Sequence, residues 1–271
     1  MTTAAAFFDL DRTLMSGSSA YYVGKAAYRA GLRPWHRMLN DVVATLVFRA
    51  FGASDEKSEA VRDAILESVA GKAAADLHRM APGVIEEILP LVRPEAQALL
   101  DMHEAAGRDV YIVSASPVEI VGELARSLGI EGGLGTVSEI VDGVYTGRLD
   151  GPFLYGEGKA IKIREIAQQR GYSLQACYAY SDSGSDLPMM QLVGNPVAVN
   201  PDRALQAVAH HRGWPVIEFN VTGRRRRRAA MSGGFGVVAG TAGYMLGRVH
   251  TERQVRRLLE ETTTRRWRRR A

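Results

Sequence analysis

Cysteine is almost absent from this chain of 271 residues: Cys177 is the only one, so no disulfide can form within the chain. The N-terminus, MTTAAAFFDLDRT, lacks the basic start and the apolar stretch of about 7–15 residues that mark a secretory signal peptide. With 46% hydrophobic and 24% charged residues, the composition excludes fibrous, wholly disordered and multi-span membrane proteins. We therefore expect one large or two small globular units, with the catalytic part in the cytoplasm.

Lysine is absent from residues 224–271, which carry 14 Arg and three Glu and hence a formal charge of +11. Residues 1–223 carry 20 basic and 27 acidic residues, a formal charge of −7. An acidic body is a poor surface for nucleic acid, whereas an arginine-rich tail suits phosphate in a lipid headgroup or in nucleic acid. We expect the body and the tail to meet different surroundings.

The pattern of apolar residues in the body predicts an α/β fold. Residues 4–8 form an apolar run that ends in Asp9, which is typical of a buried parallel strand with polar groups at its carboxyl end. After residue 93 the predicted strands and helices alternate, which indicates a Rossmann-like parallel sheet sandwiched by helices. We expect strands over 109–114, 134–141, 176–180, 196–199 and 215–219, and helices over 94–106, 117–128, 159–170, 187–192 and 201–210. Asp142-Gly143 predicts the turn of a hairpin that leads from 134–141 into residues 144–146.

Residues 18–92 contain helix signals and no convincing strand. Helices are expected over 20–30, 34–51, 55–69 and 72–91, the last one interrupted at Pro82-Gly83. Because this block separates the first strand from the second, we interpret it as a helical cap inserted into the sheet. The predicted division is a core of residues 1–16 and 93–222, a cap of residues 17–92, and a tail of residues 223–271.

Four polar motifs follow one another at the ends of predicted core elements. They are Asp9-x-Asp11-x-Thr13, Ser114, Lys159 and Asp182-x-x-x-Asp186. Two carboxylates two residues apart at a strand end point the same way, and with a third they form a hard-oxygen site for Mg²⁺. Hydroxyl and ammonium groups supply donors for phosphoryl oxygens. The set therefore predicts phosphoryl transfer.

These motifs resemble those of the haloacid dehalogenase (HAD) superfamily, subfamily IB, which is phosphoserine-phosphatase-like and has a helical C1-type cap. Residues 7–14, FFDLDRTL, are similar to its first motif, 113–117, VSASP, to its second, 156–159, GEGK, to its third, and 180–189, YSDSGSDLPM, to its fourth. The resemblance spans residues 4–220 and does not include the tail. It implies a HAD core with an inserted cap and a phosphatase activity that needs Mg²⁺.

The resemblance also implies a role for each matching residue. Asp9 is the expected nucleophile, which forms an aspartyl-phosphate, and Asp11 the expected general acid and base. Asp9, the Asp11 carbonyl and Asp182 are expected to hold Mg²⁺, with Asp186 supporting a metal-bound water or Lys159. Thr13, Ser114 and Lys159 are expected to bind the substrate phosphate. An aspartate at position 11 favours a phosphatase, because dehalogenases lack it and transporting ATPases carry threonine there.

Two departures from the family pattern bear on the substrate. Phosphoserine phosphatases usually carry a glutamate nine residues after the nucleophile, where this chain has Ser18, and glycines after the second-motif serine, where it has Ala115-Ser116-Pro117. We expect a small organic phosphate, with phosphoserine, histidinol phosphate and a glycerophosphate-type headgroup as candidates. Phosphoserine is disfavoured among them.

The tail leaves two interpretations open. Residues 231–247 are uncharged, contain six glycines and lie between arginines, which suits association with an anionic membrane. The other interpretation is a solvated tail that is disordered or loosely helical. A different function follows if the tail is the active part: a membrane-anchoring or nucleic-acid-binding protein that uses the HAD fold as a scaffold. The intact carboxylates argue against that alternative, and nucleic acid is the less favoured partner.

Overall fold

The computed structural model describes residues 3–30, 62–63, 66–67 and 69–219. The chain divides into two compact units, one of residues 1–181 and 185–197 and the other of residues 182–184 and 198–271. The helix expected over 34–51, most of the one over 55–69, and the tail with its uncharged stretch 231–247 lie outside the described residues. Within the described ranges, no helix has the length and apolar character needed to cross a membrane.

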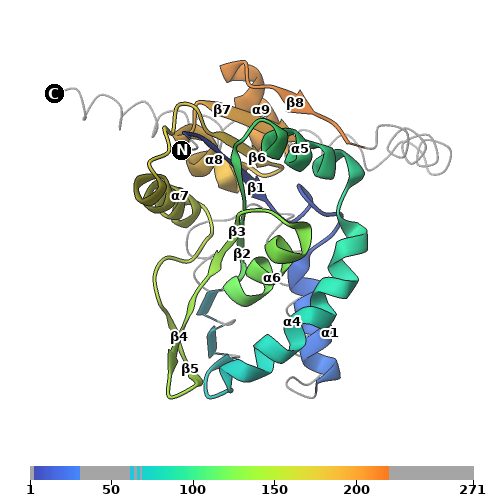
Figure 1. The fold of residues 1–271 in the computed structure, drawn as a ribbon, viewed down its shortest axis with the longest axis vertical. Helices are drawn as coiled ribbons and strands as arrows, with labels where there is room; N and C mark the ends of the chain where they lie inside the picture. The colour runs from blue at the N-terminus through green and yellow to red at the C-terminus, as the bar shows by residue number, and fades with distance from the viewer. Residues whose placement is uncertain (1–2, 31–61, 64–65, 68, 220–271) are drawn as a thin grey trace, which may run out of the picture. The chain divides into compact units, whose positions relative to one another are not determined.

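A parallel sheet of six strands carries the fold, in the order β3-β2-β1-β6-β7-β8 (Figure 1). β1 lies between β2 and β6 and is parallel to both, with Asp9 opposite Val113 and Phe8 opposite Tyr180. Every residue of β1 is buried, as expected for a central strand of a sheet covered on both faces. The strands are β1 (Ala5–Asp9), β2 (Asp109–Pro117), β3 (Gly132–Thr136), β6 (Tyr178–Ser181), β7 (Asn195–Val199) and β8 (Val216–Ile217). The parallel α/β sheet expected from the sequence is confirmed.

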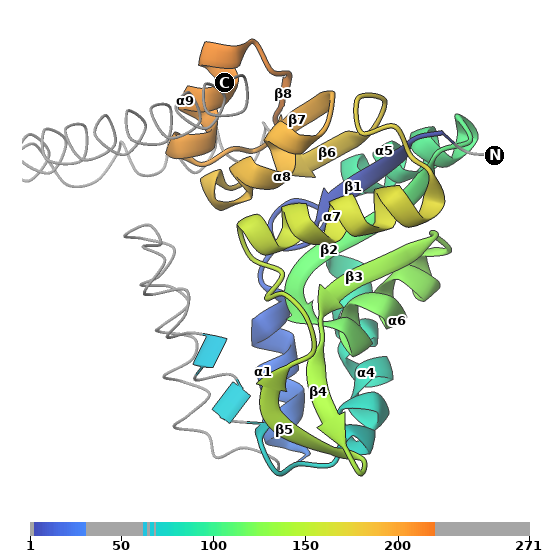
Figure 2. The ribbon, with the colours of Figure 1, turned by 90° about the vertical axis from the view of Figure 1, so that its left-hand side faces the viewer.

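Helices flank the sheet of the first unit. α5 and α6 pack on β2, α6 also packs on β3, and α7 packs against α8. Figure 2 shows α5 and α6 on one face of the sheet and α7 and α8 on the other, as right-handed crossovers in opposite directions require. The bounds are α5 (Pro94–Ala105), α6 (Val118–Leu128), α7 (Glu157–Arg170) and α8 (Leu187–Leu192).

The second unit contains one described helix, α9 (Arg203–Arg212). Asp202 caps its N-terminus, since the carboxylate accepts a hydrogen bond from the amide of Leu205 at 2.8 Å. The helix therefore begins later than the expected residue 201. β8 pairs in parallel with the end of β7, Ala198 opposite Val216.

Among the described residues between β1 and α5 lie the helices α1 (Ser19–Arg29) and α4 (Ala74–Ile88), the latter followed by the 3₁₀ turn η1 (Leu89–Leu91). α4 continues through Pro82, so the interruption expected at Pro82-Gly83 is wrong. Proline removes one helical hydrogen bond. Val84, Ile85 and Ile88 are buried, and α4 packs against α6 and α1. The burial of these side chains compensates for the lost hydrogen bond.

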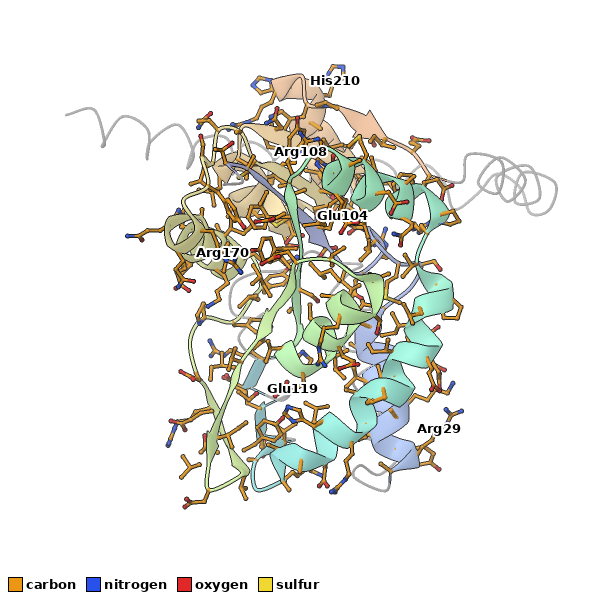
Figure 3. All side chains as sticks on the ribbon, viewed as in Figure 1. Arg29, Glu104, Arg108, Glu119, Arg170 and His210 are labelled. Atoms are coloured by element: carbon orange, nitrogen blue, oxygen red, sulfur yellow. The ribbon has the colours of Figure 1, made fainter. Side chains whose placement is uncertain are left out.

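Glu87 joins α4 to α1. Its carboxylate accepts a hydrogen bond from Lys25 at 2.7 Å and another from Arg29, which Figure 3 labels on α1. The chain segments that lead into and out of these helices also pair, with Met15 opposite Val92 in an antiparallel bridge. The chain therefore leaves the sheet and returns to it at one place.

The hairpin of β4 (Ser138–Val141) and β5 (Val144–Leu149) is separate from the main sheet. Asp142 (φ 51°) and Gly143 (φ 78°) form its turn, as predicted. The expected single strand over 134–141 is wrong, because its first half pairs with β2 and its second half with β5. β5 also pairs with residues 71–74, where the Tyr145 amide donates to the Lys72 carbonyl at 2.9 Å.

A buried histidine lies between α5 and the sheet. His103 has no solvent exposure; its Nδ1 accepts a hydrogen bond from Arg108 Nε at 2.7 Å, so Nε2 carries the proton and donates to the Tyr180 hydroxyl at 2.8 Å. Arg108, labelled in Figure 3, also stacks over the ring of Tyr178, 4.8 Å from its centroid. Burial, and secondly the charge of Arg108, lower the pKa of His103 to about 4.

We predict that this histidine makes the protein acid-sensitive. The unfolded chain takes up a proton near pH 6.5 and the folded protein only near pH 4, so stability is complete above pH 6.5 and falls as the pH drops. With the folded pKa at about 4, the wild type should lose about 3 kcal/mol of unfolding free energy between pH 7 and pH 4 through this group. Urea unfolding at several pH values, compared with His103→Gln, measures it. Equal pH slopes in the two proteins would show that His103 does not titrate in this way.

Candidate active site

The candidate site is built where neighbouring strands of the first unit end. Asp9 is the last residue of β1, and its neighbour in β2 is Val113, so Ser114 lies one residue beyond. Ser181 ends β6 on the other side of β1. The carboxyl ends of parallel strands are where open α/β sheets bind ligands. The sequence motifs therefore fall at the edge where a site is expected.

A tight turn follows β1. The amide of Leu14 donates to the Leu10 carbonyl at 3.1 Å, and Met15 donates to the same carbonyl at 3.1 Å. Arg12 inside the turn has φ 68°, a left-handed conformation that is uncommon for residues with a side chain and recurs at functional sites. This turn carries Asp11 and Thr13.

Glycines allow the start of α7 to approach its neighbours. Gly156, the residue before the helix, has φ 55° and ψ −120°. A Cβ on Gly158 would lie 1.8 Å from the carbonyl oxygen of Phe153, so only glycine fits there. Lys159 follows directly, in the first turn of α7, and is 4% exposed.

Lys159 forms the centre of a buried ionic cluster. Its Nζ lies 2.5 Å from Asp9 Oδ1 and 2.8 Å from Asp186 Oδ2. Ser181 Oγ donates to the same Asp186 oxygen at 2.7 Å. Burial alone would lower the pKa of Lys159, but the charges of Asp186 and Asp9 outweigh it and hold the pKa above the ordinary value. The lysine is therefore a permanent cation beside Asp9.

Two buried hydroxyl groups are able to donate hydrogen bonds to an oxygen atom of a bound ligand. Thr13 is 1% exposed, and its Oγ1 has no hydrogen-bond partner among the described residues. Ser114 is 4% exposed, and its Oγ accepts the amide of Ser116 at 3.1 Å, which leaves its own O–H available to donate. A buried hydroxyl without a partner is costly, so Thr13 fits a site that a ligand oxygen completes.

Asp11 contacts the first residue of α1. Its Oδ1 accepts a hydrogen bond from the Ser19 amide at 2.6 Å. The Ser19 hydroxyl in turn lies 2.7 Å from the Ser116 hydroxyl. Asp11 thus has a fixed partner in the part of the chain predicted to be the cap.

Asp182 belongs to the second unit and is 4% exposed. Its carbonyl accepts the amide of Asp202 at 2.7 Å, and the Asp202 carboxylate accepts the Gly184 amide at 3.0 Å. Asp202 therefore shapes the short segment that carries Asp182. The role of Asp182 at a metal stays a prediction.

The oxygen atoms of the predicted ligand residues decide whether this site suits Mg²⁺. The described ranges contain no group of three or more His, Cys, Asp and Glu side chains placed to hold a metal ion. The predicted ligands are nevertheless carboxylate and carbonyl oxygens from Asp9, Asp11 and Asp182, the donor type that Mg²⁺ prefers. The chemistry of the residues fits the ion.

Asp9, Lys159 and Asp186 are thus joined by direct bonds, and Ser114 follows the residue opposite Asp9. The sequence interpretation missed the supporting roles of Ser181, Ser19 and Asp202. The serine directly before Asp182 was the one usable signal among them, because a residue at the end of a strand lies at the same edge as the site.

Comparison with known families agrees with the four motifs. The family model for haloacid dehalogenase-like hydrolases matches residues 6–191. This chain belongs to the haloacid dehalogenase-like hydrolases. The resemblance drawn from the sequence, the fold it implied and the enzyme class are confirmed.

Several relatives are named as phosphatases. The chain is 38% identical over 257 residues to a phosphoserine phosphatase, SerB1, of Mycobacterium tuberculosis, a match over 94% of this chain and 82% of that protein. It is 31% identical to a histidinol-phosphatase of Neisseria meningitidis, over 79% of this chain and 98% of that one. A solved phosphoserine phosphatase in a phospho-aspartyl intermediate analogue form has a TM-score of 0.57 at 17% identity, over 76% of this chain and 91% of that one, which supports the fold.

The similarity to the mycobacterial protein extends into the tail. A match over 94% of this chain must include much of residues 224–271, which form more than a sixth of it. The family model itself matches residues 6–191, which lie within the span of residues 4–220 expected for the family resemblance.

We predict that the buried lysine stabilises the fold strongly. Lys159→Met leaves the carboxylates of Asp9 and Asp186 buried without their cation, which should cost about 3–5 kcal/mol of unfolding free energy at pH 7. Lys162→Met, on the same helix but paired at 3.0 Å with a half-exposed Glu165, is the control and should change stability by less than about 1 kcal/mol. Equal effects of the two substitutions in urea unfolding would contradict the structural role of Lys159.

Proposed function

We propose that this protein is a Mg²⁺-dependent phosphomonoesterase that acts on a small organic phosphate through an aspartyl-phosphate on Asp9. The observation that carries the proposal is the buried ionic cluster of Asp9, Lys159 and Asp186. The buried hydroxyl of Thr13, four residues after Asp9 in the chain, supports it, because it has no hydrogen-bond partner among the described residues. An anionic nucleophile, a permanent cation and buried donors at one strand edge are what phosphoryl transfer requires.

In the proposed reaction, a carboxylate oxygen of Asp9 attacks phosphorus while the bond to the leaving oxygen breaks. Asp11 gives its proton to that oxygen, which departs as an alcohol. Asp11 then takes a proton from water, whose oxygen attacks the phosphorus and releases phosphate and free Asp9. Lys159, Ser114 and Thr13 donate to the phosphoryl oxygens, where negative charge is concentrated.

Mg²⁺ would be held by the carboxylates of Asp9 and Asp182 and by the carbonyl of Asp11. A bound ion would supply positive charge that reduces the repulsion between the Asp9 carboxylate and the phosphate dianion. Asp186 supports the site by holding Lys159 in place, at 2.8 Å.

We assign residues 17–92 to a cap over this site. Hydrogen bonds between the two chain segments that enter and leave this region, residues 14–16 and 91–93, support the assignment. The Ser16 amide donates to the Leu91 carbonyl at 2.8 Å, and the Arg93 amide to the Leu14 carbonyl at 3.0 Å. These bonds lie at the expected boundaries between the core and the cap. A cap at this position would exclude water during turnover.

The substrate class rests on the relatives and on Ser18. Two relatives are named for phosphoserine and histidinol phosphate, both small organic phosphates. Ser18 cannot offer a carboxylate to a substrate ammonium group, so we place phosphoserine below other candidates, histidinol phosphate and glycerophosphate-type headgroups among them.

A screen of phosphorylated metabolites with and without Mg²⁺ tests the proposal. We expect hydrolysis that chelation abolishes, and a specificity constant for phosphoserine below that of the best substrate.

Asp9→Asn should remove activity, because a neutral amide cannot attack, while its unfolding transition stays cooperative. Asp101→Asn, an exposed carboxylate on α5, is the control and should retain activity. A wild type inactive on the whole panel, or an active Asp9→Asn variant, would overturn the assignment.

We also propose that the tail brings the enzyme, whose catalytic body is cytoplasmic, to anionic membrane. The supporting observation is the +11 charge of residues 224–271, each basic residue near such a surface contributing about 1 kcal/mol. Full-length protein should sediment with anionic vesicles at low salt and less at high salt. A chain ending at Gly223 should stay in the supernatant and keep its activity on soluble substrates. Tight nucleic-acid binding by the full chain, or no vesicle binding at all, would refute this role.

A further inference from the structure

Ser19 connects two parts of the candidate site. It is the first residue of α1 and is fully buried. Its amide donates to Asp11 Oδ1 at 2.6 Å, and its hydroxyl lies 2.7 Å from that of Ser116. The Ser116 amide donates to Ser114 Oγ at 3.1 Å. Ser19 thus contacts the proposed acid and base directly, and it is linked to the phosphate-binding Ser114 through Ser116.

The amide of Ser19 is a donor that the helix itself does not use. The first amides of a helix have no partner inside it, and they point along the axis away from the helix. A carboxylate accepts such a bond strongly, because the acceptor is charged and the helix N-terminus is positive. The bond therefore fixes the orientation of Asp11 relative to α1.

The hydroxyl of Ser19 makes a contact that does not involve Asp11. It joins α1 to Ser116, the second-last residue of β2. Since the Ser116 amide holds the Ser114 hydroxyl, this contact places α1 against the phosphate-binding side of the site. Loss of the hydroxyl alone would leave the bond to Asp11 intact.

We propose that Ser19 is a positioning residue for proton transfer: its backbone amide holds the Asp11 carboxylate in the orientation from which it protonates the leaving oxygen. The proposal rests on the phosphatase function argued above. In this proposal the Ser19 amide orients the Asp11 carboxylate, and the Ser19 hydroxyl separately holds α1 against Ser116.

The two contacts can be separated by substitution. Ser19→Ala keeps the amide and removes the hydroxyl, whereas Ser19→Pro removes both. Proline is well tolerated at the first position of a helix. The preceding Ser18, with φ −130° and ψ 122°, already has the extended backbone that a residue before proline adopts. The proline variant is therefore expected to fold, which its unfolding transition checks.

The test compares how much each substitution lowers kcat/KM for two substrates that differ in their leaving group. The value of kcat/KM reports the step in which the leaving oxygen departs. For an alkyl phosphate, whose alcohol must be protonated, Ser19→Pro should lower it about 10- to 100-fold. For p-nitrophenyl phosphate, whose phenolate departs without a proton, the loss should be only a few-fold. Ser19→Ala should give similar, small losses with both substrates. Equal losses of the proline variant on both substrates would indicate a merely structural role and overturn the proposal.

A second measurement does not depend on activity. In protein labelled with ¹⁵N-serine, the Ser19 amide proton, identified by its absence in Ser19→Ala, should resonate downfield because it bonds to a carboxylate. Asp11→Asn should move it upfield, and Ser114→Ala, which leaves that bond in place, should move it little. An unmoved resonance in Asp11→Asn overturns the proposal whatever the phosphate screen shows, so the two failures are distinguishable.

Discussion

The ammonium group of Lys159, buried between the carboxylates of Asp9 and Asp186, is the interaction on which the site depends. Three charged groups with little solvent exposure are stable only together, since removal of one leaves the others without solvation. The cluster draws the end of β1, the start of α7 and the segment after β6 to one point. It also keeps a cation beside the proposed nucleophile, so the approach of a phosphate dianion to Asp9 is less strongly opposed.

The surrounding backbone meets the geometric demands of this cluster. Gly158 lets the first turn of α7 lie against the Phe153 carbonyl, which brings Lys159 to the strand edge. The left-handed Arg12 closes the turn that carries Asp11 beyond β1. A parallel sheet with helices on both faces supplies the rigid frame. The site is thus a set of local departures from regular structure on a regular scaffold.

The parts of the site that the sequence predicted are those encoded by short spacings at strand ends. Asp9 and Lys159 belong to motifs whose types and order point to phosphoryl transfer, and the buried apolar runs located the strands. Ser19 and Asp202 could not be found in this way. Ser19 binds Asp11 through its backbone amide, which no sequence pattern marks, and Ser116 is distant in the sequence. Asp202 accepts a bond from a backbone amide. The strand expected over 134–141 was wrong for a related reason. Its second half pairs with β5, and propensity does not specify which partner a strand selects.

The identity of the nucleophile is the central claim, and trapping of the phosphoryl group tests it most directly. Protein turning over its best substrate would be quenched in acid, reduced with borohydride and mapped by mass spectrometry. We expect reduction of the side chain of Asp9, in higher yield in Asp11→Asn, where hydrolysis of the intermediate is slowed. Modification at another carboxylate, or none in either protein during measurable turnover, would contradict it.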